Sequence, residues 1–198
     1  MKKLSLELRH TALVVIDLQE MIAGRDGLIP LSGYDVTQRN NQLAAALKNT
    51  PALISLVRVN NTGKEGFSPE TDAQSEQRVQ ATSMQMAKYT MAIAEDLTAT
   101  NVIKTNKHNW GAFYGTDLDV QLRRRGIDTI ILTGIATSMG VDTTAREAAQ
   151  RGYRIIFVPD AMTDMSQVAH ETAVNHIFPR LGYIRQLDEI LALILASK

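Results

Sequence analysis

Short apolar runs alternate along the chain with longer stretches of mixed polarity. Six runs have the length and the β-branched content of strands, and they cover residues 11–16, 52–59, 101–104, 129–133, 154–158 and 183–185. Runs of this kind are typical of strands that are buried on both faces of a sheet.

Five stretches between and after these runs have the spacing of apolar residues that helices show. They cover residues 36–49, 116–125, 141–151, 170–178 and 187–196. Gly126 and Gly152 stand where two of these helices should end, as glycine often does. The alternation predicts an α/β fold, a three-layer α/β/α sandwich of Rossmann-like type with a mainly parallel sheet of about six strands.

No internal repeat and no shift in composition separates one part of the chain from another. We therefore predict one domain over residues 1–198. Residues 60–85 form a long polar stretch with two glycines and a proline. Loops of this length in a compact domain are often functional, so we expect a lid over the site or a contact with a neighbouring subunit.

Composition narrows the function classes. Lysine plus arginine equals aspartate plus glutamate, 21 each, and the basic residues do not gather into one long run, so nucleic acid is not an expected partner. The cluster 123–125 falls where a helix should end and complements the helix dipole. No apolar stretch approaches a membrane span or a signal core, and we expect a cytoplasmic protein. The 198 residues include no cysteine, which excludes thiol chemistry and disulfides.

Candidate chemistry lies at the ends of the predicted strands, where open parallel sheets bind ligands. Asp17 directly follows the first strand, although it could equally be a helix cap or a turn residue. Lys107 follows the third strand, with Trp110 and Phe113 as a possible aromatic wall; a solvated loop lysine is the alternative. The small-residue turn 133–141 joins a strand to a helix, and its free N–H groups could stabilise an oxyanion or simply make a tight turn.

Three motifs then carry a family resemblance: DLQ at 17–19, Lys107 ahead of WGAFYGTDL at 110–118, and GIAT at 134–137 leading to VDTTAR at 141–146. In this order and spacing, from about Thr11 to the C-terminus, the chain resembles the isochorismatase-like hydrolases. The resemblance implies an Asp–Lys–Cys triad in which Asp17 and Lys107 match the first two members. Gly140 occupies the cysteine position. It also implies substrate contacts from Gln19, Trp110, Phe113, Ile135, Ala136 and Thr137.

The glycine changes the expected mechanism. Isochorismatases proper, which also resemble this pattern, carry glycine there and cleave a vinyl ether without a covalent intermediate. Asp17 would then protonate the substrate, Lys107 would orient Asp17 or hold a substrate carboxylate, and Gly140 would leave room. Burial would raise the pKa of Asp17 above its ordinary value of about 3.9 and Lys107 would lower it, and the sequence leaves the balance open. There are two alternatives. Ser138 or Thr137 could act as a substitute nucleophile, or the protein could be a non-catalytic binder or an oligomeric scaffold.

The resemblance also sets expectations for metal, backbone and assembly. The nicotinamidase branch carries an Asp-x-His pair after the second strand, where this chain reads NNT at 60–62, so no metal and no cofactor is predicted. His170 and His176 lie six apart on different faces of one helix and are interpreted as ordinary helix residues. We expect a cis peptide bond at Ile135–Ala136 and Asp17 roughly 3 to 5 Å from Lys107. We also expect a homodimer or homotetramer, with 157–178 and 60–85 as candidate contact segments.

Overall fold

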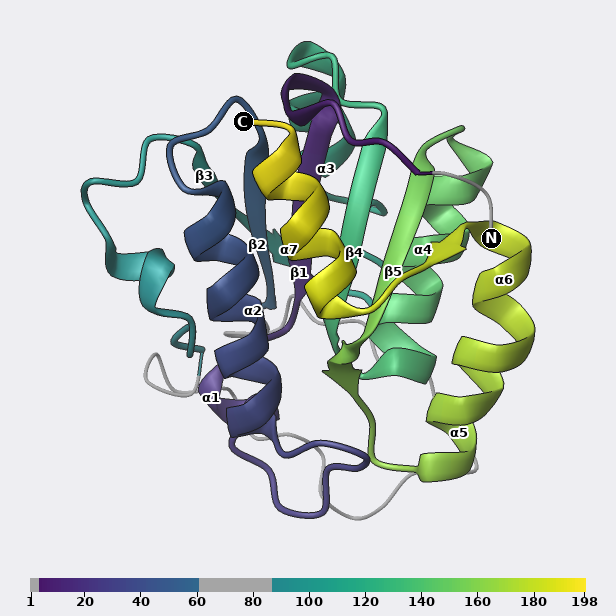
Figure 1. Cartoon of the computed structure of the whole chain (residues 1–198). Coiled ribbons are helices and arrows are strands. Elements are labelled where there is room, and N and C mark those ends of the chain that lie inside the picture. The colour runs from purple at the N-terminus through teal and green to yellow at the C-terminus, as the bar shows by residue number, and fades with distance from the viewer. Residues whose placement is uncertain (1–3, 61–86) are drawn as a thin grey trace.

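The computed structural model describes residues 4–60 and 87–198. Six strands form one sheet in the order β3-β2-β1-β4-β5-β6, and every neighbouring pair is parallel (Figure 1). The strands are β1 (Thr11–Ile16), β2 (Leu53–Val59), β3 (Val102–Lys107), β4 (Thr129–Ile135), β5 (Arg154–Thr163) and β6 (Tyr183–Ile184). The predicted three-layer α/β architecture is confirmed.

Helices cover both faces of the sheet. They are η1 (Leu8–His10), α1 (Glu20–Ala23), α2 (Gly33–Leu47), η2 (Ala92–Glu95), α3 (Leu118–Arg124), η3 (Thr137–Val141), α4 (Asp142–Gln150), α5 (Gln167–Thr172), η4 (Ala173–Ile177), α6 (Phe178–Leu181) and α7 (Leu187–Ala196). In Figure 1, α2 and α7 lie in front of the sheet, whereas α4 lies behind it. Successive side chains of a strand point to opposite faces. Leu13 and Val15 of β1 accordingly join the apolar cluster under α2 and α7, and Ala12 and Val14 join the cluster under α3 and α4.

Three strands continue past their predicted ends: β4 by two residues, to Ile135, and β3 and β5 by more. β3 continues to Lys107 instead of ending at residue 104, because it is an edge strand and exposes alternate polar residues such as Lys104 and Asn106. β5 continues to Thr163 instead of ending at residue 158, after a shift of register opposite Leu132 and Gly134. The extensions of β3 and β5 bring their last residues to the same edge of the sheet as Asp17, which follows β1.

The helix predicted at 170–178 differs most from the structure. It begins at Gln167, passes through the π-helical turn η4 and continues as α6 to Leu181. Pro179 does not end it, because it directly follows the π-helical turn, where the Phe178 N–H already bonds five residues back, to the Ala173 carbonyl, and the regular pattern is interrupted. Phe157 and Phe178, the ends of one candidate contact segment, are buried and stack at 4.1 Å between ring centroids. That this segment contacts another subunit stays a prediction.

The predicted loop at 60–85 lies, apart from Asn60, outside the described residues. Within 4–60 and 87–198, no helix has both the length and the apolar character needed to cross a membrane.

Candidate active site

Asp17 lies at the point where the strand order reverses. β1 and β4 are neighbours at the centre of the sheet, with β2 and β3 on one side and β5 and β6 on the other, and ligands bind at such a switch point in open α/β sheets. The chain leaves β1 through Asp17 at φ 55°, and the Asp17 N–H still donates to the Val57 carbonyl at 2.9 Å. Only 4% of Asp17 is exposed. Its carboxyl group therefore lies inside the protein, at the carboxyl end of the central strands.

Lys107 reaches this carboxyl group from the end of β3. Since β2 separates the two strands, their backbones lie roughly 10 Å apart, a span that a lysine side chain can cross. The Lys107 Nζ lies 2.8 Å from Asp17 Oδ2, within the expected range. It also donates to the carbonyls of Asn109 at 3.0 Å and Trp110 at 2.9 Å. These three acceptors match the three N–H bonds of the ammonium group, which is 1% exposed.

The structure settles the direction of the Asp17 pKa shift. Burial raises the pKa of Asp17 from 3.8 to about 6. Lys107 lowers it through its charge and its hydrogen bond, and the nearby Val59 backbone lowers it as well, but together they offset only part of the rise. Asp17 Oδ1 is buried and has no hydrogen-bond partner among the described residues. One carboxyl oxygen is thus bound to Lys107, and the other is available to hold a proton.

Gly140 faces the same carboxyl group. A Cβ atom built at Gly140 would lie 3.3 Å from Asp17 Oδ2, 3.0 Å from Ile16 Cγ2 and 3.5 Å from the Trp110 carbonyl oxygen. A side chain at position 140 would therefore begin in contact with both Ile16 and Asp17. Glycine leaves that space without a side chain, beside the ion pair of Asp17 and Lys107.

The backbone of the turn comes close to β1. Gly134 has a φ of 115°, and a Cβ there would collide with the backbone of Ile16, so this position requires glycine. The Ile135–Ala136 peptide bond is cis, as expected. Ile135, Ala136 and Thr137 are all buried.

A second set of contacts fixes the turn from the side of β5. Thr137 Oγ1 donates to the Thr163 carbonyl at 3.0 Å and lies 2.8 Å from His170 Nδ1. Because the Thr137 hydroxyl proton is used on Thr163, His170 Nδ1 is the donor in the second bond. The Ser138 N–H donates to Asp164 Oδ2 at 2.6 Å. Asp164 is 2% exposed and His170 is 7% exposed, and burial lowers the pKa of His170.

Sequence reasoning missed Asp164 and treated His170 as an ordinary helix residue. The signal for Asp164 was its position directly after a strand, the same signal that identified Asp17, but the predicted fifth strand ended too early at residue 158. His170 was considered only as a metal ligand paired with His176. Nothing in the helical spacing indicates that its ring would reach the turn after β4.

The remaining predicted contact residues have varied surroundings. Both ends of the Gln19 side chain bind the backbone of Val59, as its Nε2 donates at 3.1 Å and its Oε1 accepts at 2.8 Å. Gln19 thus fastens the end of β2 beside Asp17. Trp110 is 60% exposed and contributes its carbonyl to Lys107. Phe113 is buried with its ring 5.7 Å from that of Tyr153. Phe113 therefore has a packing role, and its contact with a substrate stays a prediction.

Comparison with known proteins agrees with this fold and identifies the family. The family model "Isochorismatase domain" matches residues 11–189, and the chain belongs to this isochorismatase-like hydrolase family. It is 41% identical over 194 residues to YwoC, an uncharacterized isochorismatase family protein of Bacillus subtilis, covering 96% of this chain and 97% of that protein. The structure of an isochorismatase family protein from Burkholderia thailandensis aligns with a TM-score of 0.84 at 35% identity, covering 96% of this chain and 98% of that one.

A more distant relative has a named activity. The ureidoacrylate amidohydrolase RutB of Methylorubrum extorquens is 28% identical over 194 residues, which cover 88% of this chain and 78% of that protein.

Proposed function

We propose that this protein is a hydrolase that cleaves a small anionic vinyl ether without forming a covalent enzyme intermediate. Asp17 is the acid in this proposal. The observation that carries it is the buried carboxyl group of Asp17, whose pKa burial raises to about 6 and which adjoins Gly140, a position without a side chain. A carboxylic acid with a pKa near the working pH can both deliver and regain a proton.

The proposed reaction has three steps. Protonated Asp17 gives its proton to the terminal carbon of the double bond, whose π electrons form the new C–H bond, and an oxocarbenium ion results. A water molecule adds to the cationic carbon and returns a proton to the Asp17 carboxylate. The hemiketal then breaks its C–O bond, with transfer of the hydroxyl proton, and releases a ketone and an alcohol. The first step needs the protonated form of Asp17, which burial favours.

Lys107 acts as a positioning residue in this proposal. Its ammonium group already has three acceptors, namely Asp17 Oδ2 and the carbonyls of Asn109 and Trp110. This supports the orienting role over direct binding of a substrate carboxylate. When Asp17 gives up its proton it becomes a carboxylate, and this negative charge stabilises the positive charge of the oxocarbenium ion formed in the same step.

The amidohydrolase name of the RutB relatives suggests a different reaction for the same scaffold. In this family, amide hydrolysis goes with a cysteine at the position of Gly140. Glycine offers no atom for a covalent bond to the substrate. The vinyl ether route instead needs no nucleophilic side chain, and Asp17 supplies the acid that it requires.

The enolpyruvyl ether isochorismate is the first probe of this proposal. In D2O the wild-type protein should produce pyruvate with one deuterium in its methyl group, because Asp17 delivers a proton that exchanges with solvent. Asp17→Asn should abolish this activity, and Asp188→Asn, which changes an exposed carboxylate in α7, should retain it. Activity that survives in Asp17→Asn would contradict the proposal.

A second candidate function is a catalytically silent small-molecule binder or scaffold. Glycine in the family's cysteine position favours it. The same experiment separates the two: binding of isochorismate, followed by NMR, without turnover in the wild-type protein would identify a binder.

A further inference from the structure

A hollow of about 260 Å³ opens at the edge of the sheet opposite Asp17. Figure 1 shows that the strands begin at this edge and that α1 and α5 lie at the other end. The residues that line this hollow, which we call the edge pocket, are Arg9, Pro51, Ala52, Leu53, Thr100, Asn101, Val102, Ile103, Arg125 and Ile127. Its volume is just below the roughly 300 to 1,000 Å³ of pockets for drug-sized ligands, so it suits a small molecule.

The edge pocket is positively charged. Two arginines line it, and none of its lining residues is acidic. The Arg9 side chain is exposed and makes no hydrogen bond or ion pair within residues 4–60 and 87–198. Arg125 is also exposed, and its Nη1 donates only to the neutral oxygens of Gln121. Guanidinium groups without carboxylate partners are suited to bind a carboxylate or a phosphate.

The two arginines belong to segments that are fastened together. His10 Nδ1, next to Arg9, lies 2.6 Å from the carbonyl oxygen of Gly126, next to Arg125. The N–H of Asp128 donates to the His10 carbonyl at 3.0 Å. The backbones that carry Arg9 and Arg125 are therefore fixed relative to one another before any ligand arrives, which reduces the cost of ordering them.

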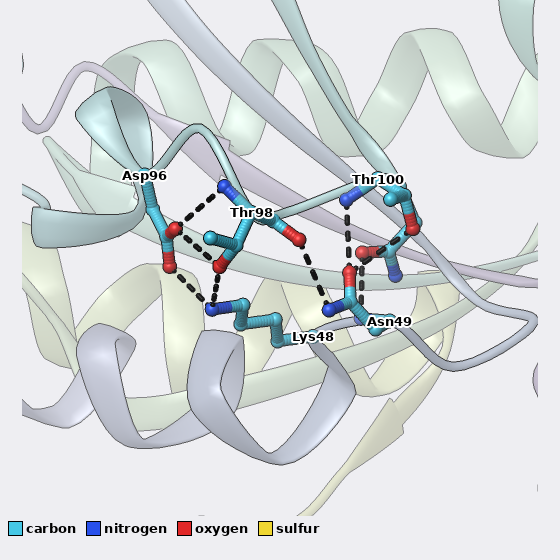
Figure 2. Close-up of polar contacts among 6 residues, drawn as sticks. Lys48, Asn49, Asp96, Thr98 and Thr100 are labelled. Carbon is cyan, nitrogen blue, oxygen red and sulfur yellow. Dashed lines mark hydrogen bonds and ion pairs between the residues drawn. The ribbon is translucent and has the colours of Figure 1, made fainter.

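The opposite wall is fixed by Asn101. Its Nδ2 donates to the carbonyls of Leu47 at 2.9 Å and Ala52 at 2.6 Å, and its Oδ1 accepts from the N–H of Asn49 at 2.9 Å. Figure 2 shows that Asn49 in turn binds the backbone at Thr100. The wall formed by residues 51–52 and 100–101 is thus held by side-chain hydrogen bonds to the backbone.

The same network contains a lysine, but its charge is neutralised. Lys48 Nζ lies 2.6 Å from Asp96 Oδ2, and hydrogen bonds from Lys48 and Thr98 lower the pKa of Asp96 to about 2 (Figure 2). The acidic residues next to the segments of the arginines, Glu7 and Asp128, do not line the edge pocket. Glu7 lies 3.6 Å from His10, and Asp128 accepts from the Thr129 hydroxyl at 2.6 Å. Arg9 and Arg125 thus supply the charge of the edge pocket.

Apolar side chains complete the lining. Ala52, Leu53 and Ile127 are 1%, 5% and 3% exposed, and Val102 and Ile103 are partly buried beside them. An inorganic ion would use the arginines and make no contact with these apolar groups. A ligand with an apolar body and an acidic group would use both.

We propose that the edge pocket binds a small organic anion, with its acidic group on Arg9 and Arg125 and its apolar body against Leu53, Val102 and Ile127. This site lies at the edge opposite Asp17, so it is separate from the proposed hydrolytic site and does not depend on it.

The test is an NMR titration of the ¹⁵N-labelled full-length protein with phenyl phosphate, which joins a doubly charged group to an apolar ring. Inorganic phosphate and benzyl alcohol serve as the probes with charge alone and ring alone. Phenyl phosphate should shift the amide signals of residues 100–103 and 127 with a Kd of about 1 mM or tighter. Both partial probes should bind at least about fivefold more weakly, and added salt should weaken the binding of phenyl phosphate.

Variants locate the binding. Arg9→Gln and Arg125→Gln should each raise the Kd by roughly threefold to tenfold, as expected for loss of one charge-assisted contact. Arg124→Gln is the matched control, because Arg124 is an exposed neighbour of Arg125 that does not line the edge pocket. All three substitutions change exposed side chains, so the variants should fold.

Three results would overturn the proposal. One is a lack of shifts in residues 100–103 and 127 at saturating probe, or shifts confined to residues 134–141 beside Asp17. Another is equal affinity for inorganic phosphate, which would show ion pairing alone. The third is an Arg124→Gln effect as large as that of Arg125→Gln. None of these results bears on whether Asp17 acts as an acid.

Discussion

Replacing Gly140 by alanine adds one methyl group between Ile16 and Asp17. The new Cβ would lie 3.0 Å from Ile16 Cγ2 and 3.3 Å from Asp17 Oδ2. Carbon atoms pack best at about 3.5 to 4.0 Å, so the Ile16 methyl must move by several tenths of an ångström. Extra carbon atoms in a packed interior cost about 1 to 3 kcal/mol. Alanine regains about 1 kcal/mol over glycine in a helical turn.

The net result should be a loss of roughly 0 to 2 kcal/mol in the free energy of unfolding, measured by urea denaturation. The effect on the active site should be larger than the effect on stability. The methyl group packs against Asp17 Oδ2 and adds to its burial, so the pKa of Asp17 should rise above about 6. It also fills the space proposed for substrate or water, and vinyl ether hydrolysis should fall by at least about tenfold.

Ser138→Ala is the control for Gly140→Ala, because it changes the same turn at a half-buried residue. It should leave both the pKa of Asp17 and the activity close to those of the wild-type protein. It also tests Ser138 as a substitute nucleophile. If Gly140→Ala were more stable by the full helical gain, with the pKa of Asp17 unchanged, position 140 would not face Asp17 and the site geometry would be wrong.

Three further substitutions test the surroundings of the site. Lys107→Met should raise the pKa of Asp17 further, so that Asp17 takes up a proton at neutral pH. The lost hydrogen bonds of Lys107 should then lower the free energy of unfolding by about 1 to 3 kcal/mol; a pKa that falls would refute the assigned role. Asp164→Ala removes the acceptor of the Ser138 N–H and should cost about 1.5 to 3 kcal/mol in urea denaturation, whereas an unchanged midpoint would mean the turn does not need it. Burial lowers the pKa of His170 below 6.5, so the stability it supplies is present above about pH 6.5 and is lost as the pH falls. His170→Gln should therefore flatten the decline in unfolding free energy between about pH 7.5 and 5.5, and parallel curves for both proteins would contradict this.

Much of the site was predictable because it follows from chain direction. In a parallel sheet all carboxyl ends of the strands lie at one edge, so residues that directly follow strands gather there. This rule brings Asp17, Lys107 and the turn 133–141 to one edge, the family resemblance singles out Gly140 within that turn, and the structure confirms that they meet. The family resemblance added the expected ion pair and the cis bond at Ile135–Ala136, both of which are present.

Other features depend on packing that no local pattern records. The pKa of Asp17 reflects two opposed effects, burial and Lys107, and their balance depends on how completely the surrounding atoms exclude water. Asp164 was hidden because β5 resumes after a shift in register, which a run of apolar residues does not reveal. The edge pocket needs Arg9 and Arg125 to converge from segments more than a hundred residues apart in the chain, and only the fold brings them together.

The central claim is that Asp17 is a buried acid that is protonated in part near neutral pH. The direct test is a ¹³C NMR titration of the Asp17 carboxyl carbon, assigned by comparison with Asp17→Asn. A midpoint near 6 would agree with the proposed acid, and hydrolysis should then decline as the pH rises through about 6. A midpoint at or below about 4 would show a carboxylate that stays ionised beside Lys107. Asp17 could not then supply the proton, and the proposed mechanism would fail.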